Sequence, residues 1–399
     1  MNKKITLGLC ISLVAICCTV TYVLSTTIAL NTYNEKIAGI GEREAFYTKY
    51  QEIDSFVRNN FIGEIDENGL IVNVFDGYMT GISDKYAKYL TADEYYDFQQ
   101  NESGSFITAG MITEPENGGY IKVTDVYENS SAAEIGIAAG DIITEVEGVS
   151  ILESGVGKAL NNLRGDEGTR LNITTLRDGV EAKHTLIRQR IDIVTVRGVV
   201  YGDVGYLRIT GFNRLTDIQF LNLFDEMETA GVKGIIMDLR GTGGMLLTPV
   251  KNMLNRFIGN AALATAEDKF KNTTNIITTD GSTPSDLPIV ALINKDTSNF
   301  AELFAAILRD FKNAQIVGTA SAGDATMTKT QVLRDGSAIT ISIAKVKSAA
   351  SAGFDGTGIQ PDFIVDMTAP VETDITNIEN TNDTQLKKAF DILGSLKQP

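Results

Sequence analysis

The 399-residue chain has no tryptophan, a single histidine and three cysteines. Because Cys10, Cys17 and Cys18 are the only cysteines, residues 19–399 can form no disulfide, no thiolate metal site and no cysteine nucleophile. A Ser/His/Asp triad would depend on His184, which lies in a β-type run and is expected at the surface, and a zinc site would need carboxylates almost alone. The sequence therefore predicts neither a metal ion nor another cofactor.

Positive charge is also scarce. Lys and Arg total 35 against 51 Asp and Glu, which gives a net charge of −16 and makes nucleic acid a poor partner. Apolar residues still make up 43% of the chain, enough to supply a buried core. The length corresponds to about two to three domains. The composition therefore indicates a multi-domain globular protein.

One long stretch lacks charge altogether, and it lies at the amino terminus. Residues 5–30 carry no charged side chain and would form a helix of about 39 Å, enough to cross a bilayer with some tilt. Lys3 and Lys4 precede the stretch, which keeps the short tail in the cytoplasm and exports the rest. Because residues 27–29 are a weak cleavage site, we expect an uncleaved anchor rather than a removed signal peptide. The predicted location is a bacterial-type cell membrane, single-pass, with the bulk of the chain extracytoplasmic.

Helical patterns follow this anchor segment, residues 1–30. Apolar and aromatic residues recur at helical spacing over residues 37–61 and again over residues 70–82. The motif Thr91-Ala92-Asp93-Glu94 is typical of an N-cap followed by acidic residues in the first turn of a third helix. We therefore assign residues 31–103 to a small helical segment.

The remaining chain divides by texture into three parts. Residues 104–192 hold short β-type runs separated by turn residues. Residues 193–368 alternate β and α patterns, which indicates a largely parallel sheet with a ligand site beyond the strands that end at Leu239 and Ile293. Residues 369–399 are expected to form a polar linker and a final amphipathic helix, which docks onto the core or onto a second subunit.

The β-rich part carries a recognisable motif. Residues 131–143 place a short helix of small residues directly before a Gly-Asp turn and a strand. Here the sequence resembles a PDZ domain in the permuted form found in bacterial proteases. The resemblance implies that Thr108, Ala109, Gly110 and Met111 form the loop whose backbone N–H groups hold a peptide carboxylate, while the peptide adds as a strand. The expected ligand is a polypeptide or a C-terminal peptide.

Motifs in the later part agree with this resemblance. The run Ile236-Met237-Asp238-Leu239-Arg240 followed by Gly243-Gly244 is similar to the strand and glycine turn of the carboxyl-terminal processing peptidases, the tail-specific serine proteases of family S41. Residues 335–338 and 356–362 resemble the late hairpin and the closing motif of that family. The expected fold class is therefore multi-domain α+β, with an N-terminal membrane helix, a small helical segment, a permuted PDZ β-module and an α/β tail-protease core of the ClpP/crotonase type.

The catalytic positions of this family are substituted here. The family uses a Ser nucleophile, a Lys base and a Gln that orients the Lys, and the resemblance puts these positions on Asn299, Asp324 and Thr328. An amide cannot attack a carbonyl as a serine does, and a carboxylate cannot replace a partly desolvated amine. We therefore expect the catalytic roles to be lost, whereas an oxyanion hole of backbone N–H groups near Gly243 and Gly244 would persist. The alternative for the two glycines is a tight turn that requires positive φ.

Neighbouring residues offer two ways to rescue the chemistry. Ser298 and Lys329 form an alternative Ser/Lys pair, but a shift of one residue re-aims the hydroxyl, and in an extended segment Lys329 faces away from Asp324. Glu302 and Asp324 suggest a carboxylate pair for hydrolysis or metal binding. Glu302 is instead expected to cap the helix that opens at Phe300.

Three functions are consistent with these observations. The leading hypothesis is a membrane-anchored, extracytoplasmic pseudoprotease that binds polypeptides and regulates an active protease or protects a client. The runner-up is an active serine-type endopeptidase that cleaves protein C-terminal regions with Ser298 as a displaced nucleophile. The third is a scaffold that only forms homo-oligomers.

Overall fold

The computed structural model describes residues 14, 16–27, 30, 40–244, 246–281, 284–367 and 382–396. Much of the predicted anchor, residues 5–30, lies outside these ranges, although residues 16–27 are helical. Within the described residues, no helix has the length and apolar character needed to cross a membrane. The chain divides into two compact units, residues 1–71 and 72–399.

The first unit contains helix α2 (Ile40–Asn60) and the beginning of helix α3 (Glu67–Gly81), close to where the helical patterns were predicted. Arg58, in the last turn of α2, joins the two helices. Its guanidinium donates to Asp54 at 2.9 Å within α2 and to both oxygens of Glu67 at 2.5 and 2.9 Å. The short connection between the two helices is thereby held by one arginine.

Helix α4 (Ala92–Ser103) begins where the capping motif predicted. The Thr91 hydroxyl accepts a hydrogen bond from the Glu94 N–H at 3.3 Å, and the Glu94 carboxylate accepts one from the Thr91 N–H at 2.8 Å. This reciprocal pair is a capping box. Directly before it, β1 (Lys88–Leu90) pairs antiparallel with β18 (Ala338–Ser348). The segment expected to be helical therefore also supplies a strand to a distant sheet.

The β-rich module is a sheet in the order β3-β4-β5-β7-β8, with a short β6 beside β5. Its core includes Ile121, Val123 and Ile143, which are fully buried. A separate pair of strands, β2 and β9, joins the module's two ends. The bounds are β2 Ser105–Thr108, β3 Met111–Pro115, β4 Ile121–Val126, α5 Ser131–Glu134, β5 Ile142–Val146, β6 Val149–Ser150, α6 Ile151–Ser154, α7 Val156–Leu163, β7 Arg170–Arg177, β8 Val180–Ile187 and β9 Gln189–Asp192.

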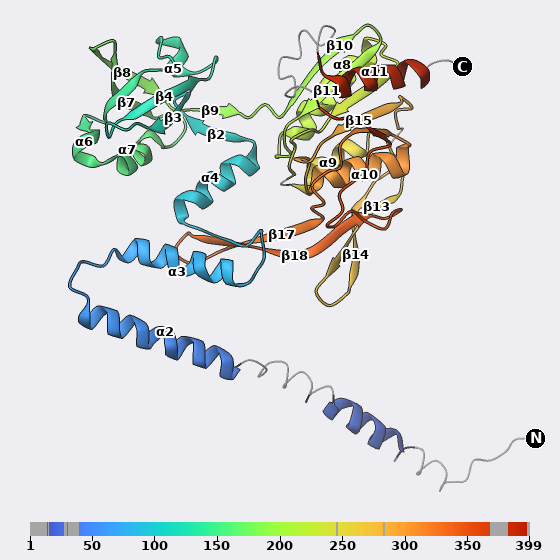
Figure 1. Ribbon diagram of the computed structural model, residues 1–399, viewed down its shortest axis with the longest axis horizontal. Coiled ribbons are helices and arrows are strands. Elements are labelled where there is room, and N and C mark those ends of the chain that lie inside the picture. Colours follow the sequence, from blue (N-terminus) through green and yellow to red (C-terminus); the bar gives the residue numbers. More distant parts are fainter. Residues whose placement is uncertain are drawn as a thin grey trace, which may run out of the picture. The chain divides into compact units, whose positions relative to one another are not determined.

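The α/β domain is built on a sheet in the order β10-β11-β12-β15-β16-β19, which is parallel from β11 onward. Alternate residues of β12 face opposite sides. Ile235 and Met237 join the core formed with helices α8, α9 and α10, whereas Ile236 packs with α11 (Figure 1). The bounds are β10 Val196–Tyr201, β11 Val204–Ile209, α8 Thr216–Thr229, β12 Gly234–Asp238, α9 Leu247–Leu254, β15 Ile289–Ile293, α10 Phe300–Lys312, β16 Gln315–Gly318, β19 Phe363–Ile364 and α11 Thr384–Leu396.

A second, antiparallel sheet accompanies this domain. It runs in the order β1-β18-β13-β14, with β17 also paired to β18. The predicted late hairpin is confirmed, because Asp335 and Gly336 form the turn between β17 (Thr326–Val332) and β18. Strands β13 (Ala262–Asp268) and β14 (Thr273–Thr278) were not predicted.

Candidate functional site

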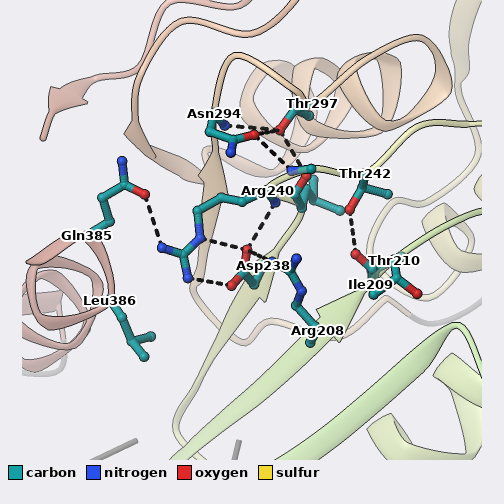
Figure 2. Close-up of polar contacts among 12 residues, drawn as sticks. Arg208, Ile209, Thr210, Asp238, Arg240, Thr242, Asn294, Thr297, Gln385 and Leu386 are labelled. Carbon is teal, nitrogen blue, oxygen red and sulfur yellow. Dashed lines mark hydrogen bonds and ion pairs between the residues drawn. The ribbon is translucent and has the colours of Figure 1, made fainter. Parts of the chain in front are cut away.

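Two loops meet beyond the carboxyl ends of β12 and β15, as the parallel sheet predicted (Figure 2). The Gly241 N–H donates to the Asn294 side-chain oxygen at 2.8 Å. The Thr297 hydroxyl donates to the Leu239 carbonyl at 2.9 Å, and the Ser298 N–H donates to the Thr242 carbonyl at 2.9 Å. The turn after β12 and the approach to α10 are therefore held together by three hydrogen bonds.

A network of buried charged side chains lies at the start of this turn (Figure 2). Asp238 and Arg240 are both fully buried, and the guanidinium donates to the carboxylate at 2.9 and 2.6 Å. Arg240 also reaches Asp383 at 2.6 Å and Gln385 at 3.1 Å, next to α11. Burial alone would raise the pKa of Asp238, but the charges and hydrogen bonds of Arg240 and the charge of Arg208 outweigh it and hold that pKa below its ordinary value.

The three glycines of this turn, Gly241, Gly243 and Gly244, differ in why a glycine is needed. Positive φ occurs at Gly241 (+68°) and not at Gly243 or Gly244, so the tight-turn alternative for the two later glycines is wrong. A side chain at Gly244 would instead meet the Phe300 backbone nitrogen at 2.7 Å. Within the described residues, neither the Gly243 nor the Gly244 N–H donates a hydrogen bond. The turn therefore approaches the first residue of α10 closely, with these two amides unused.

Asn299 lies at the elbow between the loop after β15 and helix α10. Its backbone, with φ +53° and ψ −122°, is in a region that non-glycine residues rarely adopt and that is concentrated at functional sites. The side-chain NH₂ group donates to the Thr326 carbonyl at 2.7 Å. The side-chain oxygen is buried and has no hydrogen-bond partner among the described residues. The residue expected at the nucleophile position is therefore a fixed amide on a strained turn.

Glu302 ties this elbow to the loop that contains Asp324. Its fully buried carboxylate accepts from the Asn299 N–H at 3.0 Å, which confirms the predicted cap. It also accepts from the Ser321 hydroxyl at 2.5 Å and from the N–H groups of Gly323 and Asp324, each at 2.7 Å. Four donors thus engage this carboxylate, so Glu302 organises the site instead of forming a carboxylate pair with Asp324.

Asp324 lies beside Asn299, because one oxygen of Glu302 accepts from both backbone N–H groups. The Asp324 side chain is 7% exposed. One carboxylate oxygen is 3.8 Å from the Lys85 ammonium, and the other is buried without a hydrogen-bond partner within the described part of the chain. Burial raises the pKa of Asp324, while the charge of Lys85 partly opposes the shift.

The other predicted site residues lie apart from this centre or lack partners. Thr328 and Lys329 are exposed on β17, in register with Ser342 and Ile341 of β18. The Ser298 side chain lies against Gly243. Its hydroxyl has no hydrogen-bond partner among the described residues, and no contact joins it to Lys329. The structure therefore provides Ser298 with a position next to the glycine turn but with no base.

The PDZ-like module has a cavity beside the loop that was predicted to bind a peptide. This cavity of about 230 Å³ is lined by Thr108, Ala109 and Met111, by apolar side chains of α7 and by Arg164, which the sequence analysis did not identify. No strand of the described residues pairs with the outer edge of β3, the kind of edge to which an extended peptide can add. Gly110 is required in this loop, because its φ is +100° and a side chain would collide with Ser130.

His184 is half-buried on β8, and its Nε2 lies 2.8 Å from the Thr175 hydroxyl on the neighbouring strand. This contact joins two strands of the sheet. The residue was expected at the surface, and the structure shows it half-buried. Across the described ranges, no group of three or more His, Cys, Asp or Glu side chains is placed to hold a metal ion.

The fold and the site define the class of the protein. Residues 203–365 match the model of Peptidase family S41, and residues 122–177 match a PDZ domain model. These matches fall on the α/β domain and on the β-rich module, which confirms both resemblances. The chain therefore contains a region that matches Peptidase family S41 and a region that matches a PDZ domain.

Individual proteins are also similar to this chain. The chain is 27% identical over 359 residues to the "Probable CtpA-like serine protease" of Staphylococcus aureus (strain N315), covering 89% of this chain and 72% of the relative. It is 28% identical over 332 residues to the "Carboxy-terminal-processing protease" of Bartonella bacilliformis, covering 81% and 75%. Among solved structures, the photosystem II D1 C-terminal processing protease aligns with a TM-score of 0.46 and 21% identity, covering 79% of this chain and 86% of that one.

Proposed function

We propose that this S41 homologue is a pseudoprotease, which binds polypeptide segments without cleaving them. The observation that carries the proposal is the pair Asn299 and Asp324. The elbow residue presents an amide that is hydrogen-bonded to the Thr326 carbonyl, and the neighbouring position is a buried carboxylate. Neither group can form the activated hydroxyl that acyl transfer requires.

Binding is supported by features that the substitutions leave untouched. The groove of the PDZ domain and the unpaired edge of β3 suit an extended peptide. The unused N–H groups of Gly243 and Gly244 are suited to hold a peptide carbonyl. A polypeptide client or an active protease is the partner that such a protein would serve, and a homo-oligomer is a further arrangement.

The proposal includes a membrane anchor formed by residues 5–30. Its support is the absence of charge over that stretch and the two lysines, Lys3 and Lys4, that precede it. An extracytoplasmic position would place the groove where exported polypeptides pass. Protease protection of the tagged carboxyl terminus in intact cells, with loss of protection after the outer layers are opened, tests this orientation.

The binding claim is tested with an unfolded, fluorescently labelled protein. The expected result is saturable binding in fluorescence anisotropy, while mass spectrometry after prolonged incubation shows the labelled protein intact. A matched variant, Met111→Asp, places a negative charge in the groove of the PDZ domain and should weaken binding without changing the fold. Unchanged anisotropy at every concentration of the native chain would contradict the proposal.

A second candidate is an active serine-type endopeptidase with Ser298 as its nucleophile. The observation in its favour is the contact of the Ser298 side chain with Gly243, next to the unused amides of the turn. The named relatives are described as a serine protease and a processing protease. Cleavage that disappears in Ser298→Ala alone would establish this candidate in place of the first.

A further inference from the structure

The groove of the PDZ domain contains a single ionisable side chain. Of the residues that line its cavity, only Arg164 carries a charge, and it directly follows helix α7. The remaining wall is largely apolar and includes Met111, Leu160 and Leu163. An anionic group that enters this groove would therefore meet one cationic partner inside it.

That partner is already engaged by acidic residues of α4. One terminal nitrogen of Arg164 lies 2.9 and 2.7 Å from the two carboxylate oxygens of Asp97, and the other lies 3.4 Å from Asp93. The guanidinium also lies over the Tyr96 ring, 5.5 Å from its centroid. Asp97 thus presents to the arginine the same chemical group that a peptide terminus would present.

The loop of residues 108–111, beside the groove, uses one of its backbone N–H donors internally. The Gly110 N–H donates to the Thr108 hydroxyl at 3.1 Å, so one amide expected to hold a carboxylate is used within the loop. The Gly110 carbonyl accepts from the Tyr127 N–H at 2.9 Å, which fixes the loop in this conformation. The Gly110 amide is therefore not free to hold a carboxylate, and Arg164 is the charged partner that the groove offers.

We propose that Asp97 is an internal ligand of the groove, which occupies Arg164 until a peptide carboxylate replaces it. The inference rests on the proposed polypeptide binding. The ligand class is an extended peptide with apolar residues and a carboxylate, supplied by the chain terminus or by an Asp or Glu side chain. Exchange of the carboxylates would break the ion pairs of Arg164 with Asp97 and Asp93 and loosen α4 from α7.

The test compares three fluorescent peptides of one apolar sequence on the full chain: a free acid, a C-terminal amide, and an amide with Glu as its last residue. We expect both carboxylate peptides to bind more tightly than the plain amide. The first and third peptides separate the terminal carboxylate from the side-chain carboxylate. Asp97→Asn should tighten binding of the carboxylate peptides about threefold, the scale of an exposed ion pair, and leave the plain amide unchanged.

Three further variants complete the test. Arg164→Gln should abolish the difference between acid and amide peptides, while Arg164→Lys, which keeps the charge without the planar fork, should retain part of it. Glu181→Gln removes one negative charge from β8, at the opposite edge of the same sheet, and should change none of the three affinities. Binding with no preference for carboxylates, or an equal response of all three peptides to Asp97→Asn, would overturn the inference alone. Binding of no peptide would overturn the proposed function with it.

Discussion

At the scale of single residues, the charge at position 324 is opposite to the one that the resemblance implies. The resemblance assigns this position to a lysine, and the chain has an aspartate there that is 7% exposed. Its nearest cation, Lys85, is 3.8 Å away, and one carboxylate oxygen has no hydrogen-bond partner among the described residues. A buried carboxylate with an unpartnered oxygen is an energetic cost to the fold.

Asp324→Asn is therefore expected to stabilise the protein at neutral pH. Because burial raises the pKa of Asp324 in the folded state, the fold favours its protonated form, and stability is lost as pH rises through that folded pKa. We expect the variant to raise Tm by about 2–4 °C at pH 7, equivalent to about 1 kcal/mol. The gain should vanish below the ordinary pKa of an aspartate.

Thermal unfolding followed by circular dichroism across pH 3–8 measures this effect. Glu267→Gln is the matched control, because that exposed carboxylate is paired with Lys271 at 2.8 Å and has little to gain from neutralisation. A Tm of Asp324→Asn that is lower than native at pH 7 would contradict the assignment of a raised pKa.

Removing a charge from the buried ion pairs of Arg240 should destabilise the protein, in contrast to Asp324→Asn. Arg240→Met leaves the carboxylates of Asp238 and Asp383 buried without their main cation, which should reduce the free energy of unfolding by about 3–5 kcal/mol. Lys271→Met breaks an exposed pair with Glu267 and should leave Tm nearly unchanged. Equal losses for the two variants in urea unfolding would refute the role given to burial.

At the scale of elements, the start of α10 holds the site together through one side chain. Glu302 connects the elbow at Asn299 with the Ser321–Asp324 loop through four hydrogen bonds. The sequence predicted the cap, since an acidic residue in the first turn of a helix is a local signal. It could not predict the bonds to Ser321 and Gly323, which depend on how a separate loop folds back.

Glu302→Gln is expected to destabilise the domain. The amide keeps the size of the side chain but replaces one acceptor oxygen with an NH₂ group that faces N–H donors. We expect a loss of about 2–4 kcal/mol in the free energy of unfolding, measured by urea denaturation. Glu226→Gln, on the exposed face of α8, supplies the control and should fall within about 0.5 kcal/mol of native. A neutral effect of Glu302→Gln would show that the four bonds are not formed together.

At the scale of the whole molecule, the parallel sheet and its helices were predictable because their signals are local. Strand β12 reads as a continuous apolar run, and α8 has buried apolar residues at helical spacing, Phe220, Phe224 and Met227. The antiparallel sheet was not predictable in the same way, since β1 joins β18 across most of the chain. Such pairings depend on tertiary contacts that no window of sequence contains.

The same distinction applies to the site. The resemblance placed the nucleophile and base positions at Asn299 and Asp324, and the structure brings these two residues together on Glu302. The resemblance also assigned Thr328, yet that residue is exposed on β17. Arg164 was missed, because its contact with Asp97 joins two helices whose individual patterns carry no sign of it.

We propose that the chain binds polypeptides at a centre that cannot cleave them. The first experiment follows cleavage of an unfolded protein by mass spectrometry, with the native chain beside a variant that combines Asn299→Ser, Asp324→Lys and Thr328→Gln. We expect no cleavage by the native chain and a gain of cleavage in the combined variant, since the strained elbow and the unused amides are already present. Cleavage by the native chain that is abolished by Ser298→Ala would contradict it.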